Sequence, residues 1–196
     1  RHVHTLSIRV DAYARDDGLW DLEATLTDTK SRDFKLATGV RKQGEPVHDM
    51  RLVVTIDTHL TIVAAQAHSS WVPYPGDCDA FPEAYQALVG LNLSQDFRRH
   101  VRERLGGVRG CTHLTDLTAL LPTAAIQAFS GEVIKVADGS EGDDPAHAAR
   151  RPHQIDRCRA LRADGPAVAK YYPRWHRAPQ APADADSRQH PEGHDA

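Results

Sequence analysis

The fold is indicated by residues 4–28, which read HTLSIRVDAYARDDGLWDLEATLTD. Hydrophobic and polar residues alternate over residues 4–12 and again over residues 20–28. A period of two is typical of a strand with one buried face. Between the two runs lies Asp16-Asp17-Gly18, where glycine allows the positive φ of a tight turn. The stretch therefore predicts a β-hairpin.

A second hairpin is predicted after residues 29–46, a polar segment that we interpret as a long loop or an irregular edge strand. Alternation resumes on both sides of a turn at residues 57–59. The residues on its apolar side are His48, Met50, Leu52, Val54, Ile56, Leu60, Ile62 and Ala64. The two hairpins together predict a four-stranded, mostly antiparallel sheet with one apolar face.

Helical periodicity replaces alternation after Trp71. Three groups of apolar residues follow at helical spacing: Tyr85, Leu88 and Val89; Phe97, Val101 and Leu105; and Leu114, Leu117, Leu121, Ala125 and Ala128. Pro122 should kink or break the last helix. The sequence thus predicts an α+β fold: an antiparallel meander sheet of about four strands with two or three helices packed on one face.

Composition excludes several classes of protein. The chain has 24 Lys+Arg against 27 Asp+Glu, a net charge of −3, whereas a general nucleic-acid-binding protein needs a basic surface. No apolar run approaches the roughly 18 residues of a membrane span. The 3 cysteines are widely spaced, without a CxxC pair, and no signal peptide is visible. These features predict a reducing, cytoplasmic compartment.

The length of 196 residues suits one domain with a tail. We predict a single α+β domain over residues 1–177. Residues 178–196 contain no Leu, Ile, Val, Phe, Tyr or Trp, so they cannot bury enough apolar surface to order themselves. A disordered C-terminal tail is therefore expected there.

Two histidines, His4 and His48, share the parity of the core-facing side chains. Such a residue is commonly a hydrogen-bonded core histidine, but it can also serve as a general base. Burial lowers the pKa of an imidazole, which then stays neutral and accepts a proton near pH 7. Asp49 cannot orient His48, because adjacent strand residues point to opposite faces. A carboxylate partner must come from elsewhere.

Gly110-Cys111-Thr112-His113-Leu114 lies at a predicted helix start. Free backbone N–H groups and the helix dipole favour a thiolate there, so Cys111 could be a nucleophile assisted by His113. The plainer reading, which we favour, has Thr112 capping the helix and Cys111 packing as a small residue. No thiol-enzyme signature surrounds Cys111.

Three further sets of residues could have either a structural or a functional role. Charged residues on the hairpin, among them Arg9, predict a solvated, salt-linked face, while Asp28 and Lys30 at the strand end could place a carboxylate and an ammonium at a pocket mouth. The segment around Lys170-Tyr171-Tyr172 could stack an aromatic ligand or attach the C-terminus to the body. A zinc site could be drawn from Cys78, Cys111, Cys158, His48 and His113, but their spacings match no zinc motif.

The order of these motifs resembles one bacterial family, the domain of unknown function number 2889. The resemblance covers about residues 1–176 and rests on Asp17–Ala24, Thr27–Lys30, His48–Met50, the Pro73–Cys78 loop, Gly110–Leu114, Ile155-Asp156 with Cys158, and Asp164–Pro166. It implies catabolism of lignin-derived aromatics, and a cofactor-free lyase that releases a hydroxymethyl group as formaldehyde from a phenylcoumaran-type dimer. No catalytic residue is carried over from the family.

This reaction needs a base that takes the hydroxyl proton, a cation or acid that stabilises the leaving phenolate, and aromatic side chains that hold the substrate rings. His48 is the candidate base. The other candidates are Lys30, Arg9, Tyr74 and His113 for catalysis, and Trp20, Trp71, Cys111 and Tyr172 for substrate binding. The expected partner is a small aromatic substrate, with no cofactor, no metal, no nucleic acid and no membrane; self-association is left open. The alternatives are a non-catalytic aromatic-binding or accessory protein, and a zinc hydrolase or structural zinc domain.

Overall fold

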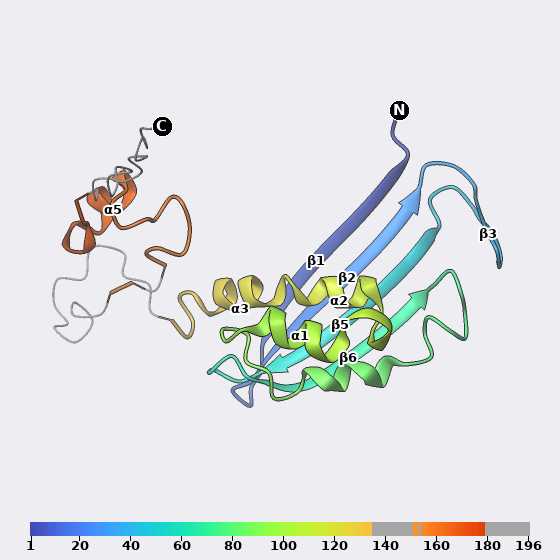
Figure 1. The fold of residues 1–196 in the computed structure, drawn as a ribbon, viewed down its shortest axis with the longest axis horizontal. Helices are drawn as coiled ribbons and strands as arrows, with labels where there is room; N and C mark the ends of the chain where they lie inside the picture. Colours follow the sequence, from blue (N-terminus) through green and yellow to red (C-terminus); the bar gives the residue numbers. More distant parts are fainter. Residues whose placement is uncertain (135–150, 153, 179–196) are drawn as a thin grey trace, which may run out of the picture. The chain divides into compact units, whose positions relative to one another are not determined.

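The computed structural model describes residues 1–134, 151–152 and 154–178 (Figure 1). The chain groups into two compact units, Arg1–Lys135 and Val136–Ala196, and each is described by itself. The division falls inside the range 1–177 that the sequence predicts as one domain. Residues 179–196 of the predicted tail lie outside the described residues.

The first unit is built on a four-stranded antiparallel sheet. Its strands are β1 (His4–Ala14), β2 (Trp20–Lys30), β5 (Pro46–Ile56) and β6 (Ile62–Trp71), in the order β1-β2-β5-β6. This meander confirms the predicted α+β class. Between β2 and β5, where we expected a loop or an irregular edge strand, a small hairpin forms from β3 (Phe34–Leu36) and β4 (Gly39–Arg41).

The predicted alternation is confirmed on the two central strands. Their buried apolar residues of the predicted parity are Leu22, Ala24 and Leu26 on β2 and Met50, Leu52, Val54 and Ile56 on β5. Val47 and Thr55, which have the other parity on β5, are buried as well. The predicted parity continues one step beyond Leu26 and Met50 to Asp28, which pairs with His48. A polar pair thus occupies the end of an otherwise apolar face.

The parity predicted for β6 is wrong after Ile62. Ala64 is exposed and Ala65 is buried. Ile56 pairs with Ile62 but Thr55 pairs with Ala64, so Val63 is an extra residue in a β-bulge. One inserted residue moves every later side chain to the opposite face.

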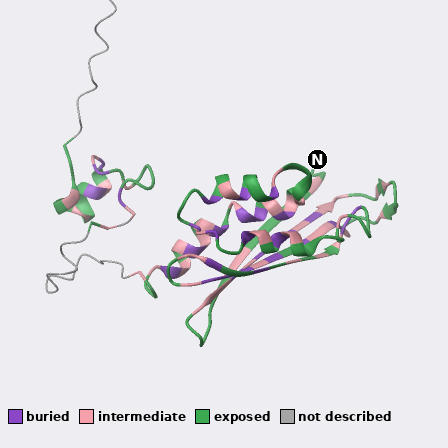
Figure 2. Cartoon of the chain, turned by 60° about the horizontal axis from the view of Figure 1, so that its bottom comes forward, coloured by how far each residue is buried: buried purple, intermediate pink, exposed green. Residues whose placement is uncertain are grey.

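Leu6 and Ile8 lie on the face that the alternation predicts to be apolar, but they are not buried. Their side chains lie on the helix side of the sheet, yet they are 52% and 40% exposed. β1 is an edge strand, and Figure 2 shows that buried residues gather where the helices lie against the sheet.

The helices pack on one face of the sheet (Figure 1). They are η1 (Pro82–Leu88), α1 (Phe97–Leu105), η2 (Gly107–Arg109), α2 (Thr112–Thr118) and α3 (Leu121–Phe129). The stripe Phe97, Val101 and Leu105 is buried as predicted. Pro122 stands in the first turn of α3 and separates it from α2. Val89 is exposed, against expectation, because η1 ends at Leu88 and the chain becomes extended.

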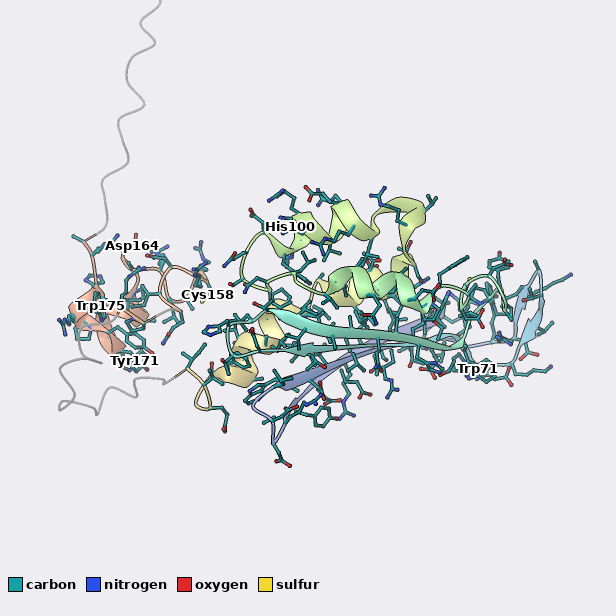
Figure 3. All side chains as sticks on the ribbon, turned by 90° about the horizontal axis from the view of Figure 1, so that it is seen from below. Trp71, His100, Cys158, Asp164, Tyr171 and Trp175 are labelled. Carbon is teal, nitrogen blue, oxygen red and sulfur yellow. The ribbon has the colours of Figure 1, made fainter. Side chains whose placement is uncertain are left out.

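The described part of the second unit contains α5 (Pro166–Tyr171) and η3 (Pro173–Trp175) around a small cluster of Ile155, Ala163 and Val168. Its labelled residues in Figure 3 include Cys158, Asp164 and Trp175. Among the described residues, no helix is long and apolar enough to cross a membrane.

Candidate functional site

The site is organised by Asp28, which holds two histidines at the end of the apolar face. Its Oδ1 accepts a hydrogen bond from the backbone N–H of His48 at 2.6 Å and lies 3.1 Å from His48 Nδ1. Its Oδ2 lies 3.3 Å from His4 Nε2. The register shift between Asp28 and Thr29 interrupts regular pairing at this point, and this lets the carboxylate reach the backbone of the neighbouring strand.

The carboxylate of Asp28 is ionised at neutral pH. Burial opposes its charge, but the hydrogen bonds from the backbone and ring of His48 and from His4 outweigh that effect and hold the pKa of Asp28 below its usual value. An ionised Asp28 accepts only, so the Nδ1 of His48 carries the hydrogen of their bond. The Nε2 of His48 is then left as a proton acceptor.

His113 stacks on His48 from the start of α2. The two ring centroids are 3.9 Å apart, with an angle of 33° between the planes. Burial, together with the neighbouring His48, lowers the pKa of His113. His113 is therefore neutral near pH 7.

The hydroxyl of Tyr85 holds the backbone of Cys111 through hydrogen bonds. It donates to the carbonyl of Cys111 at 2.9 Å, accepts the N–H of Cys111 at 3.1 Å and lies 3.0 Å from Thr115 Oγ1. Burial raises the pKa of Tyr85 to about 12, so the hydroxyl keeps its proton. The thiol of Cys111 lies 4.0 Å from the sulfur of Met50. Cys111, not Thr112, occupies the N-cap position of α2.

A cavity of about 1020 Å³ opens over these groups. Its polar lining includes His48, His68, Tyr85, Arg109, Cys111 and His113, and its apolar lining includes Met50, Pro73, Tyr74, Phe81 and Val108. Sites for small molecules typically combine apolar walls with a few convergent polar groups. The volume is ample for a ligand with two aromatic rings.

The structure brings together four of the nine site residues predicted from the sequence: His48, His113, Tyr74 and Cys111 all line the cavity. The other five lie elsewhere. Arg9 is paired with Asp11 on β1, and the ammonium of Lys30 lies 5.3 Å from the ring centroid of Phe34. The Trp20 ring packs 5.1 Å from that of Phe129.

Trp71 and Tyr172 are also outside the cavity lining. The guanidinium of Arg41 lies 4.7 Å from the ring centroid of Trp71, and Figure 3 places Trp71 at the end of the sheet that carries the β3–β4 hairpin. Tyr172 belongs to the second unit, where its hydroxyl accepts a hydrogen bond from Gln154 at 3.0 Å.

The sequence predicts Asp28 at a pocket mouth but does not indicate its contact with His48. The parity of β2, extended by one step past Leu26, would have placed the carboxylate on the core face. Tyr85 was assigned to a helix face, without its hydroxyl contacts. His68 and Arg109 were not singled out, because nothing local distinguishes a cavity wall from an exposed strand or turn.

No cluster of three or more His, Cys, Asp or Glu side chains suited to a metal ion occurs in the described ranges. Of the residues considered for zinc, Cys78, Cys111, His48 and His113 line the cavity, whereas Cys158 is an exposed residue of the second unit.

Comparison with known proteins identifies a family model that matches the chain. No curated protein and no solved structure matches the chain. The matching model covers residues 4–127, which run from β1 into α3 and include Asp28, His48, Cys111 and His113. The chain therefore belongs to the family described as "Protein of unknown function (DUF2889)".

Proposed function

We propose that the cavity is the active site of a cofactor-free carbon–carbon lyase that acts on lignin-derived aromatic dimers and releases a hydroxymethyl group as formaldehyde. One observation carries the proposal: a buried carboxylate lies 3.1 Å from Nδ1 of His48, and His48 lines a cavity with aromatic and apolar walls. This arrangement suits a general base. The substrate class comes from the resemblance to the family.

The reaction balances without a redox partner. Nε2 of His48 takes the proton of the substrate's CH₂OH group, and the carbon–carbon bond to that group breaks as the C=O bond of formaldehyde forms. The released electron pair forms a carbon–carbon double bond and expels the aryl ether oxygen of a phenylcoumaran-type ring as a phenolate. That oxygen then takes up a proton. The substrate equals formaldehyde plus a stilbene-type phenol.

Asp28 stabilises the imidazolium that forms on His48, because its ionised carboxylate stays in contact with Nδ1. His113, neutral and stacked on His48, adds no competing positive charge. These two residues therefore support proton transfer to the same nitrogen.

The leaving phenolate requires a cation or a proton donor. Among the residues predicted for this task, Tyr74 lines the cavity, and Arg109 supplies a cationic wall that the sequence reasoning did not include. Tyr74 and Phe81 also present aromatic faces on which a substrate ring can stack. We assign the phenolate to Tyr74 and Arg109, which line the same cavity as the base.

The competing proposal is a non-catalytic protein that binds an aromatic ligand. Simple binding of an apolar ligand gains nothing from a buried carboxylate–imidazole pair, which costs free energy to desolvate. The Asp28–His48 pair therefore favours catalysis.

Turnover of a hydroxymethyl-bearing phenylcoumaran dimer tests the proposal. Formaldehyde and the stilbene-type product should appear in equal amounts, in the absence of added cofactor and after treatment with a chelator. Binding of the dimer without any product would instead support the accessory protein, and activity that depends on added zinc would support a zinc hydrolase.

A further inference from the structure

The two edge strands of the sheet, β6 and β1, differ in whether other parts of the chain form hydrogen bonds with their outer side. Along β6, the chain from η1 onward pairs with the outer backbone: Gly90 donates to the carbonyl of Ile62, whose N–H bonds to Leu91, and the amide of Gln86 reaches the carbonyl of Ala65. β1 is the other outermost strand (Figure 1). It is 11 residues long and contains neither proline nor lysine, two residues that commonly protect an edge.

The backbone groups that β1 leaves open can be identified from its parity. Val3 accepts from Ser31 at one end of the strand, and Arg15 donates to Leu19 at the other. Odd-numbered residues therefore direct their N–H and C=O groups toward β2, and even-numbered residues direct theirs outward. Within the described ranges, no backbone hydrogen bond from outside the four-stranded sheet reaches the backbone groups of Leu6, Ile8, Val10 and Ala12.

Apolar side chains accompany this open edge. Leu6 and Ile8 are 52% and 40% exposed and lie at successive positions on the helix side of the strand. On the other side of β1, Arg9 and Asp11 form an ion pair two residues apart. The edge therefore presents unpaired backbone, an apolar stripe and two opposite charges.

We propose that β1 pairs antiparallel with the β1 of a second copy of this chain, with Val10 opposite the partner's Val10. The outward N–H and C=O groups of the even residues can form hydrogen bonds only with those of even residues of the partner's β1. Every allowed register therefore places even residues opposite even residues and odd residues opposite odd residues. In the proposed register Arg9 lies opposite the partner's Asp11, and Asp11 lies opposite the partner's Arg9. Both are non-hydrogen-bonded positions, where opposing side chains come closest.

The neighbouring registers are disfavoured by charge. One places Arg9 opposite the partner's Arg9, and the other places Asp11 opposite the partner's Asp11; like charges directly opposite each other are destabilising. In the proposed register Ile8 lies opposite the partner's Ala12 and Leu6 opposite the partner's Ala14. These small side chains leave room for the apolar stripe to pack. The two sheets then join into one continuous sheet with a two-fold axis at Val10.

Charge reversal on the full chain tests the register. Sedimentation or light scattering should give a mass that rises with concentration toward twice 21.6 kDa. Arg9→Asp and Asp11→Arg should each raise the dimer Kd on the order of tenfold, because two symmetric pairs change from attraction to repulsion. The double variant R9D/D11R restores opposite charges and should recover the dimer. Arg98→Asp, an exposed charge reversal on α1, is the matched control and should leave Kd unchanged.

Amide hydrogen exchange read by NMR identifies the surface directly. The N–H groups of Leu6, Ile8, Val10 and Ala12 should become more protected as the protein concentration rises, while those of odd residues stay protected throughout. A monomer at every concentration would overturn the proposal, as would a dimer that R9D leaves intact. Protection of the even residues that is independent of concentration would assign the edge to another part of the same chain.

Discussion

One carboxylate oxygen of Asp28 contacts His48 twice, accepting its backbone N–H at 2.6 Å and lying 3.1 Å from its ring Nδ1. The first contact fixes the backbone of β5 against β2, and the second fixes the orientation of the imidazole. Asp28 is only 8% exposed, so water competes weakly for either contact. A structural and a chemical role thus meet in a single side chain, and variants are needed to separate them.

His48→Gln should remove catalysis and leave the fold intact. Glutamine keeps much of the volume and a hydrogen-bonding end but cannot accept the proton, and a general base contributes about 10²–10⁴-fold. Steady-state formaldehyde release should show kcat lower by that factor, with a small change in Tm. If Tm instead falls by several degrees while the rate per folded molecule persists, His48 is only a core histidine.

Asp28→Asn should weaken the dependence of stability on acid pH. Hydrogen bonds hold the folded-state pKa of Asp28 below its unfolded value. Its ionisation therefore stabilises the fold above the unfolded pKa of about 3.9, and this contribution is lost as the pH falls through the folded pKa. Urea unfolding at several pH values should show a large difference between the two proteins near pH 6 that narrows below pH 4. A difference of constant size would mean that Asp28 contributes through shape alone.

His113→Asn should affect stability in a different pH window. The pKa of His113 is lowered by burial and by His48, so the unfolded chain binds more protons than the native state below about pH 6.5. The free energy of unfolding of the unchanged protein should thus fall between pH 7 and pH 5, and the variant should lose part of this slope. The matched control is His100→Asn on α1 (Figure 3). His100 is not among the residues that line the cavity. Equal slopes in all three proteins would contradict the lowered pKa.

Cys111→Ser should keep most of the activity. The backbone of Cys111 is held by the hydroxyl of Tyr85 and its thiol lies against Met50, and formaldehyde release forms no bond to sulfur. Cys158, which is exposed, supplies an internal reference and should be alkylated faster than Cys111. Complete loss of turnover, with fast alkylation of Cys111 below pH 7, would instead identify a nucleophile.

Thr38→Val should weaken substrate binding more than turnover. The hydroxyl of Thr38 donates to the carbonyl of Pro73 at 2.6 Å, and Arg41 donates to that of Val72. These bonds connect the β3–β4 hairpin to the chain segment that contains Tyr74, a residue of the cavity wall. Valine keeps the shape and removes the bond, so KM should rise several-fold while kcat changes little. A fall in kcat with an unchanged KM would place this contact with the chemistry and not with the wall.

Local patterns in the sequence were sufficient to predict the four long strands and the main helices. Alternation in Leu22–Leu26 and Met50–Ile56 and the four-residue spacing of Phe97, Val101 and Leu105 follow from the repeat of each element, which a chain displays whatever it packs against. The same alternation was enough to place His48 on the buried face. Pro122 ended a helix because it lacks an N–H and crowds the preceding turn.

Only the tertiary structure decided what lies beside His48. Asp28 is 20 residues earlier in the chain and His113 is far later, and no local repeat reports which strand or helix they meet. The bulge at Val63 inverted the parity of β6, and the edge position of β1 left Leu6 exposed, because burial depends on neighbours supplied by other elements. Trp20 and Trp71 are aromatic residues of the kind that often line a ligand pocket. In the structure, neither of them lines the cavity between the sheet and the helices. The sequence shows which residue types are available for a site, whereas only the folded structure shows which of them lie close together.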